Sequence, residues 1–154
     1  MKGFQFKIDG DWAHFKKPET NNNPLSHDLI PKTALVGMIG AVLGIEREKM
    51  KSLFPQLSED LLYGVELLKP VKKASCGFTS HTAINPTAIK SPKAFEMLRD
   101  VSYKVCVGLY SERSQSIFDD FQNAILEGYA VYNPYLGIAN CPAELTFTSQ
   151  GEFT

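Results

Sequence analysis

The stretch Val101-Ser102-Tyr103-Lys104-Val105-Cys106-Val107-Gly108-Leu109 carries the clearest secondary-structure signal in the chain. Apolar residues occupy its odd positions and small or polar residues its even positions. This period of two predicts a half-buried β-strand. The same alternation opens the chain at residues 4–9, Phe-Gln-Phe-Lys-Ile-Asp. Two weaker strand signals lie at residues 63–71 and 144–148.

Helical patterns fill the gaps between these strands. Residues 31–43 predict a helix with Thr33 as its N-cap and Gly44 as its C-cap, and residues 117–127 predict an amphipathic helix that ends at Gly128. A charged short helix or turn at 46–57 is expected to close at Pro55. The first helix has a face of small residues, which we expect to pack tightly on the sheet: Ala34, Gly37, Gly40, Ala41 and Gly44.

The resulting order is β-α-β-β-α-β, which predicts an α+β, ferredoxin-like fold that is also called RNA-recognition-motif-like. Both helices are expected on one face of an antiparallel sheet, which leaves the other face free for a ligand or partner. Many unrelated functions use this fold, so it does not identify the function.

Composition indicates one globular domain over residues 1–154. The chain is 44% hydrophobic and 21% charged, close to the average for globular domains. Its most apolar window, residues 33–45, is too short to cross a bilayer, and no signal peptide is recognisable at the start. Three cysteines without a Cys-x-x-Cys spacing do not indicate a disulfide framework. We therefore expect a cytoplasmic protein without membrane contact.

The charge of the chain is unevenly distributed. Between Lys69 and Lys93 lie five lysines and no acidic residue, although the whole chain carries 17 acidic residues and a net charge of −1. Residues 74–93 show no clear period, so we expect either an extended excursion or a hairpin there. A basic segment on an acidic body suits a local anion contact, and an ordinary solvated loop is the alternative.

Known catalytic and nucleotide-binding motifs are absent from the sequence. It has no Walker A loop, no dinucleotide fingerprint and no His-Glu-x-x-His. The three histidines lie far apart in sequence, so neither a metal site nor a cofactor is predicted. A metal-independent ribonuclease stays open, because His81 near Lys72, Lys73 and Lys90 could supply acid, base and cation. A polar loop residue or an RNA contact is the favoured interpretation of His81.

Three segments resemble a known protein family. They are residues 12–17, Trp-Ala-His-Phe-Lys-Lys; residues 30–45, Ile-Pro-Lys-Thr-Ala-Leu-Val-Gly-Met-Ile-Gly-Ala-Val-Leu-Gly-Ile; and residues 133–143, Asn-Pro-Tyr-Leu-Gly-Ile-Ala-Asn-Cys-Pro-Ala. Together with the opening strand, they resemble the fifth CRISPR-associated (Cas) protein family, and its type I-B branch in particular. That family supplies the subunit of type I interference (Cascade) complexes that holds the 5′ handle of the CRISPR RNA.

The resemblance implies a RAMP-type domain with a long thumb hairpin between the second and third strands, at about residues 72–95. It also implies a glycine loop around Gly137 whose amides approach the handle backbone. Here Ile138 follows that glycine, where family members commonly have arginine. The chain also stops at Thr154, where family members usually continue into a C-terminal region.

We therefore expect a non-catalytic CRISPR RNA-binding subunit in antiviral defence. Its partners would be the RNA handle, the backbone subunit and the large subunit, with target DNA contacted only indirectly. The cutting branch of the family carries a tyrosine before the first helix, and residues 26–33 have none. Two alternatives stay open, namely a metal-independent endoribonuclease that processes precursor CRISPR RNA and a protein-interaction domain that never binds RNA. The expected RNA contacts are Lys16, Lys17, Lys32, Thr33, Lys72, Lys73, Phe78, His81, Lys90, Lys93, Tyr135, Gly137 and Asn140.

Overall fold

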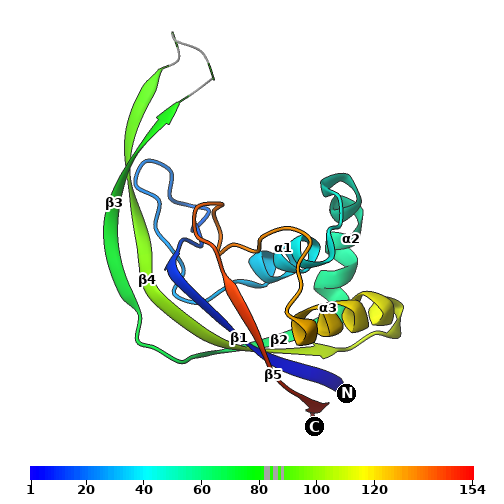
Figure 1. The fold of residues 1–154 in the computed structure, drawn as a ribbon. Coiled ribbons are helices and arrows are strands. Elements are labelled where there is room, and N and C mark those ends of the chain that lie inside the picture. The colour runs from blue at the N-terminus through cyan, green and yellow to red at the C-terminus, as the bar shows by residue number, and fades with distance from the viewer. Residues whose placement is uncertain (82–83, 85–86, 88) are drawn as a thin grey trace.

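A computed structural model describes residues 1–81, 84, 87 and 89–154 as an α+β fold around a curled antiparallel sheet (Figure 1). The part of the predicted thumb at 82–83, 85–86 and 88 lies outside the described residues. The strands are β1 (Lys2–Ala13), β2 (Leu61–Leu67), β3 (Lys72–His81), β4 (Lys90–Leu109) and β5 (Glu144–Glu152). They follow the order β2-β4-β1-β5, and β3 pairs with β4 outside this path.

The strand predicted at residues 101–109 is the second half of β4, and it pairs with both β1 and β2. Its odd-numbered residues face the core, where Tyr103, Val105 and Val107 are at most 1% exposed. Phe4 and Phe6 of β1 pack beside Phe121 at ring-centroid distances of 5.7 Å. The period-two pattern therefore identified the centre of the sheet correctly.

The helices are α1 (Lys32–Leu43), α2 (Arg47–Asp60) and α3 (Gln115–Glu127), and a 3₁₀ turn, η1 (Glu112–Ser114), precedes α3. Figure 1 shows all three helices on the same side of the sheet. The opposite face of β1 carries polar side chains, including the ion pair between Lys7 and Asp9 at 3.1 Å. The prediction of helices on one face is thus confirmed for the described elements.

The helix α2 continues past Pro55, so the prediction that it closes there is wrong. Its last residue, Asp60, is only 3% exposed. The carboxylate of Asp60 accepts hydrogen bonds from Arg113 Nη2 at 2.7 Å and Ser114 Oγ at 2.6 Å. Hydrogen bonds from Arg113 and Ser114 hold the pKa of Asp60 below its usual value. These contacts join the end of α2 to η1, which explains how the helix persists despite a proline that removes one of its own bonds.

The N-cap prediction for α1 is also wrong. Pro31 is the N-cap, and its carbonyl oxygen accepts from the amide of Leu35 at 3.1 Å. Thr33 therefore lies in the first turn, where it is exposed. The C-cap prediction is confirmed, because Gly44 ends the helix with a φ of 68°.

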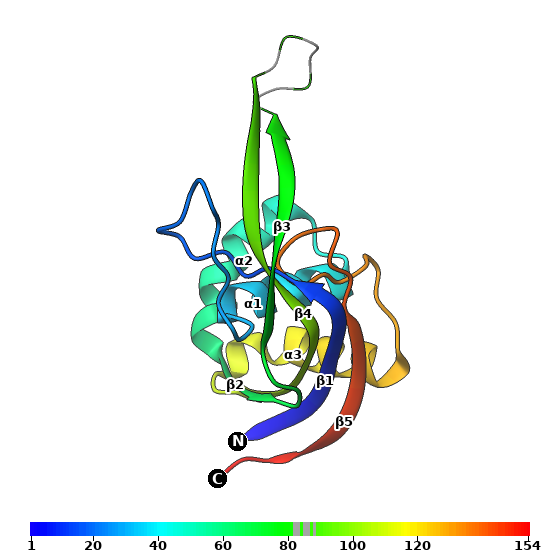
Figure 2. The same ribbon diagram turned by 90° about the vertical axis from the view of Figure 1, so that its left-hand side faces the viewer.

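The excursion after β2 is a long hairpin that rises away from the rest of the chain (Figures 1 and 2). Its arms are β3 and the first half of β4, with Lys72 opposite Arg99 and His81 opposite Lys90. The second arm continues directly into the central strand. Asp100 has a positive φ of 51° at the junction, which marks where β4 passes from the hairpin to the sheet.

The small face of α1 does not pack on the sheet, contrary to the sequence prediction. Large residues of α1 fill the core instead, among them Leu35, Ile39 and Val42. A Cβ built on Gly40 would lie 3.0 Å from the Met50 side chain of α2, whereas one built on Gly37 would meet nothing within 4 Å. The small face therefore contacts α2 at Gly40 and is open at Gly37.

This difference predicts opposite outcomes for two glycines on one helix. We expect Gly40→Leu to destabilise the fold by about 1–3 kcal/mol, because Met50 must be displaced from a packed position. Gly37→Leu should leave the midpoint of thermal unfolding unchanged or raise it, because leucine favours helix over glycine. Thermal melts of both variants beside the parent test this. Equal melting of Gly40→Leu and the parent would contradict the α1–α2 packing.

Candidate nucleic-acid interface

Acidic residues from elsewhere in the chain neutralise the lysines at the base of the hairpin. Lys73 Nζ lies 3.0 Å from Asp28 and 3.3 Å from Glu96. The hydrogen bond to Asp28, with a second to Glu96, raises the pKa of Lys73. Lys72 Nζ lies 3.8 Å from Asp100, which Lys69 contacts at 2.7 Å. The base of the hairpin is therefore much less cationic than the sequence indicates.

The cations farther along the hairpin lie apart from the described acidic side chains. Lys90 and Lys93 form no ion pair with any described residue. Lys90 lies opposite His81, and Lys93 lies opposite Phe78. The Phe78 ring is 37% exposed and meets the Phe95 ring edge to face at 5.0 Å. This end of the hairpin thus combines two uncompensated cations, an exposed histidine and a partly exposed aromatic ring.

The glycine loop is a tight turn fastened to the segment after β1. The amide of Leu136 donates to Cys141 O at 2.7 Å, and His14 N donates to Leu136 O at 3.1 Å. Gly137 has a φ of 88°, and a Cβ there would lie 1.8 Å from the carbonyl oxygen of His14. Only glycine fits this position, because both the backbone conformation and the contact exclude a side chain.

This turn contains backbone donors that lack a backbone acceptor. Within the described part of the chain, the amides of residues 137–140 donate to no backbone carbonyl. Gly137 and Asn140 are exposed, and Tyr135 is 48% exposed beside them. A run of amides without a backbone acceptor in a turn is a favourable arrangement for an anion such as a phosphate.

The segment 14–28 lies against the hairpin rather than forming a separate cationic site. Its Pro24 carbonyl accepts from the amide of Glu96 at 2.9 Å, and its Lys17 amide donates to Leu25 O at 2.8 Å. Figure 2 shows this loop beside the hairpin base. Lys16 is exposed and forms no ion pair among the described residues. Lys16 and Lys17, both predicted RNA contacts, therefore lie near the hairpin base.

Two other predicted contacts lie elsewhere. Lys32 donates through Nζ to the carbonyl oxygen of Ser58, near the C-terminal end of α2. Its charge is thus used within the fold, at a helix end that favours cations. Thr33 is exposed in the next position of α1. The structure does not bring either residue into the hairpin or the glycine loop.

A buried histidine connects the hairpin to the glycine loop, a role that no sequence pattern indicated. His14 is 1% exposed, and its Nδ1 lies 2.8 Å from the carbonyl oxygen of Glu96. Its ring also meets Phe95 at 5.0 Å. His14 therefore links the hairpin to the glycine loop, whose Gly137 rests on its carbonyl group.

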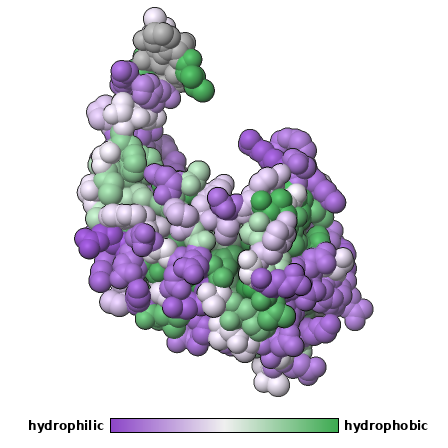
Figure 3. Space-filling view, in the orientation of Figure 1, coloured by the Kyte–Doolittle hydropathy of each residue, from purple (hydrophilic) through white to green (hydrophobic). Residues whose placement is uncertain are grey.

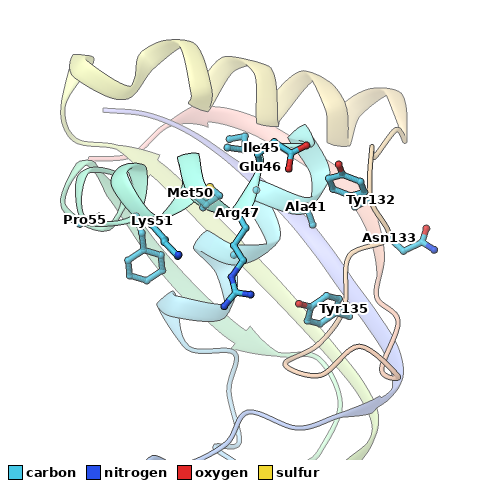
Figure 4. A pocket seen from close by; sticks show the side chains of 13 residues that line it. Ala41, Ile45, Glu46, Arg47, Met50, Lys51, Pro55, Tyr132, Asn133 and Tyr135 are labelled. Atoms are coloured by element: carbon cyan, nitrogen blue, oxygen red, sulfur yellow. The ribbon is translucent and has the colours of Figure 1, made fainter. Parts of the chain in front are cut away.

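A pocket of about 850 Å³ lies on the other side of the segment 132–135, between α1 and α2 (Figure 4). The sequence did not predict this pocket, because the glycines of α1 are expected there to pack on the sheet. The small residues of α1 are nonetheless the sequence feature from which this pocket could have been predicted. We call it the α1–α2 pocket, and its lining includes Gly37, Gly40, Ala41, Arg47, Met50, Phe54, Tyr132 and Tyr135.

Comparison with known families decides the relationship of the chain. A family model described as "CRISPR-associated protein (Cas_Cas5)" matches residues 3–148. The chain belongs to this fifth CRISPR-associated protein family. No curated protein matches it closely enough to add a relative.

Solved structures share the fold at low identity. A chain of a "CRISPR RNA-guided surveillance complex" has a TM-score of 0.67 and 16% identity, over 90% of this chain and 58% of that one. A functionally uncharacterized protein from Streptococcus mutans has a TM-score of 0.54 and 18% identity, over 96% and 66%. A chain of a "Type IV-B CRISPR Complex" has a TM-score of 0.52 and 13% identity, over 96% and 90%. This Cas5-family chain thus spans about 58% and 66% of the first two structures.

Two features are absent from the described residues. No helix there is long and apolar enough to cross a membrane. No group of three or more histidine, cysteine, aspartate or glutamate residues there could hold a metal ion. The candidate interface consists of cations, aromatic rings and backbone amides on the hairpin and the glycine loop.

Proposed function

We propose that the protein is the RNA-binding, non-catalytic subunit of a type I CRISPR interference complex and holds the 5′ handle of the CRISPR RNA. The observation that carries this proposal is the turn at residues 137–140, whose amides donate to no described backbone carbonyl and could bind phosphate in a member of a CRISPR-associated family. Backbone donors position a nucleic-acid strand without reading its sequence.

The hairpin supplies the second contact. We interpret it as the thumb of a ferredoxin-like domain, an interpretation supported by the order β2-β4-β1-β5 with β3 added beside β4. Lys90 and Lys93 would contact phosphates, while Phe78 and His81 would stack on unpaired bases. Lys72 and Lys73 would contribute less, because acidic side chains already pair with them. The branch within the type I systems stays a prediction.

Within the complex, the hairpin would also meet the neighbouring backbone subunit, and another face would meet the large subunit. Target DNA would be contacted only through these partners. Figure 3 shows a hollow between the hairpin and the body, where a partner or an RNA strand could lie.

The endoribonuclease alternative lacks support around His81. Metal-independent cleavage requires an acid and a base within hydrogen-bond reach of the reacting atoms. His81 is exposed, and its side chain forms no hydrogen bond with a described residue. Lys90 is its neighbour across the hairpin, but no tyrosine lies in the segment 26–33.

We therefore expect the protein to bind repeat RNA in the presence of EDTA without cutting it. The measurement is a gel-shift assay and a denaturing gel from the same incubation, using synthetic RNA of the CRISPR repeat from the source organism. His81→Ala should leave the RNA intact, as the parent does. Specific cleavage by the parent that disappears in His81→Ala would establish the nuclease instead.

A further inference from the structure

The lining of the α1–α2 pocket combines small residues of α1 with two tyrosine rings. Gly37, Gly40 and Ala41 of α1 leave its floor almost without side chains. Tyr132 and Tyr135, which are 51% and 48% exposed, lie across the pocket from α2 (Figure 4). A volume of about 850 Å³ is within the range of small-molecule and cofactor sites. A planar ring could enter between the helix and a tyrosine.

Arg47 provides a cation for this pocket. Figure 4 shows its side chain extending from α2 into the space between that helix and Tyr135. Arg47 forms no ion pair or side-chain hydrogen bond with any described residue. The other cation of the lining, Lys51, is paired with Glu48 at 2.8 Å. Arg47 is therefore available to an anionic or hydrogen-bonding ligand.

We propose that this pocket takes one unpaired nucleobase of the bound RNA, stacked on Tyr135, with Arg47 contacting the adjacent phosphate or the base edge. This inference rests on the proposed function and adds a base-binding site to it. Stacking on an aromatic ring suits any base, and a guanidinium binds phosphate through paired N–H groups.

The position of Tyr135 favours RNA as the occupant. Tyr135 lies two residues before Gly137, so one short segment forms both the wall of the pocket and the start of the phosphate-binding turn. A strand whose phosphate sits on the turn could place a neighbouring base behind Tyr135. An apolar side chain from a protein partner would fit the walls but would cover Arg47 without pairing its charge, which is unfavourable.

The test is an abasic scan of the repeat RNA against the full chain. The RNA loses one base at a time, and dissociation constants are measured by fluorescence anisotropy for the parent and for Gly37→Leu. That substitution extends a side chain into the pocket from a position with no neighbour within 4 Å. Gly151→Leu is the control, since this exposed glycine also has no neighbour but lies on β5.

We expect one abasic position to weaken binding to the parent by about 5- to 100-fold, as base stacking on an aromatic ring does. Gly37→Leu should bind intact RNA more weakly by a similar factor and become insensitive to that position, whereas Gly151→Leu should match the parent. If the parent binds RNA and Gly37→Leu shows the same abasic profile, the pocket does not hold a base.

Other outcomes also overturn the inference. Unchanged RNA binding by Gly37→Leu with loss of partner subunits from the assembled complex would make the pocket a protein-docking site. Absence of RNA binding by the parent itself would overturn the proposed function together with this inference.

Discussion

Gly137→Ala is expected to destabilise the protein by about 3 kcal/mol and to weaken RNA binding at least about tenfold. Two effects combine at this residue. Its φ of 88° is unfavourable for any side chain, and the added Cβ would lie 1.8 Å from the carbonyl oxygen of His14. That oxygen belongs to the backbone, so the turn itself must move, and the amides of residues 137–140 would move with it.

Gly128 offers a matched control for this prediction. It ends α3 with a φ of 70°, but a Cβ there would meet nothing within 4 Å. Gly128→Ala should therefore show the conformational effect alone, about 1 kcal/mol, with unchanged RNA affinity. Denaturant unfolding gives the stability of both variants, and anisotropy gives their affinity. Equal stability losses in the two variants would mean that Gly137 does not rest on His14 as described.

The double substitution Lys90→Ala and Lys93→Ala is expected to weaken RNA binding by about 10- to 50-fold at moderate salt. These lysines have no ion-pair partner among the described residues, so their charges are available to phosphates. Each lost phosphate contact should lower the slope of log affinity against log salt by roughly 0.7 on a single strand. The loss should therefore shrink as the salt concentration rises.

Lys72→Ala with Lys73→Ala is the matched comparison on the same hairpin. It removes the same formal charge, but Asp28, Glu96 and Asp100 already neutralise these lysines. Its effect on the salt slope should be clearly smaller than that of the distal pair. If both pairs change affinity and slope equally, position along the hairpin does not matter and the ion pairs at its base do not limit RNA contact.

The sequence predicted the elements whose patterns are local. The alternation of apolar and polar residues identified β1 and the second half of β4. The order of the elements indicated an α+β fold with its helices on one side of the sheet. The predicted end of a helix was wrong where contacts with residues distant in sequence outweigh the local effect of a proline. Pro55 does not end α2, because Asp60 at the end of that helix is held by Arg113 and Ser114, more than fifty residues away.

The candidate site was harder to predict, because its properties depend on residues far apart in sequence. Counting charges from Lys69 to Lys93 found no acid, yet Asp28 and Asp100 fold onto that segment. The continuity of β4 was hidden by Pro92 and by charged residues, which interrupt the alternation before Val101. The α1–α2 pocket requires three separate segments to meet, and only its glycine floor is visible in the sequence.

The most direct test of the central claim is to purify the protein from its source organism under native conditions and to sequence the RNA bound to it. We expect short RNAs that share a repeat-derived 5′ end, together with the other subunits of an interference complex. Gly137→Ala should reduce the recovered RNA, and Gly128→Ala should not. A preparation that contains partner subunits but no CRISPR RNA, or RNA without a common 5′ end, would contradict the account.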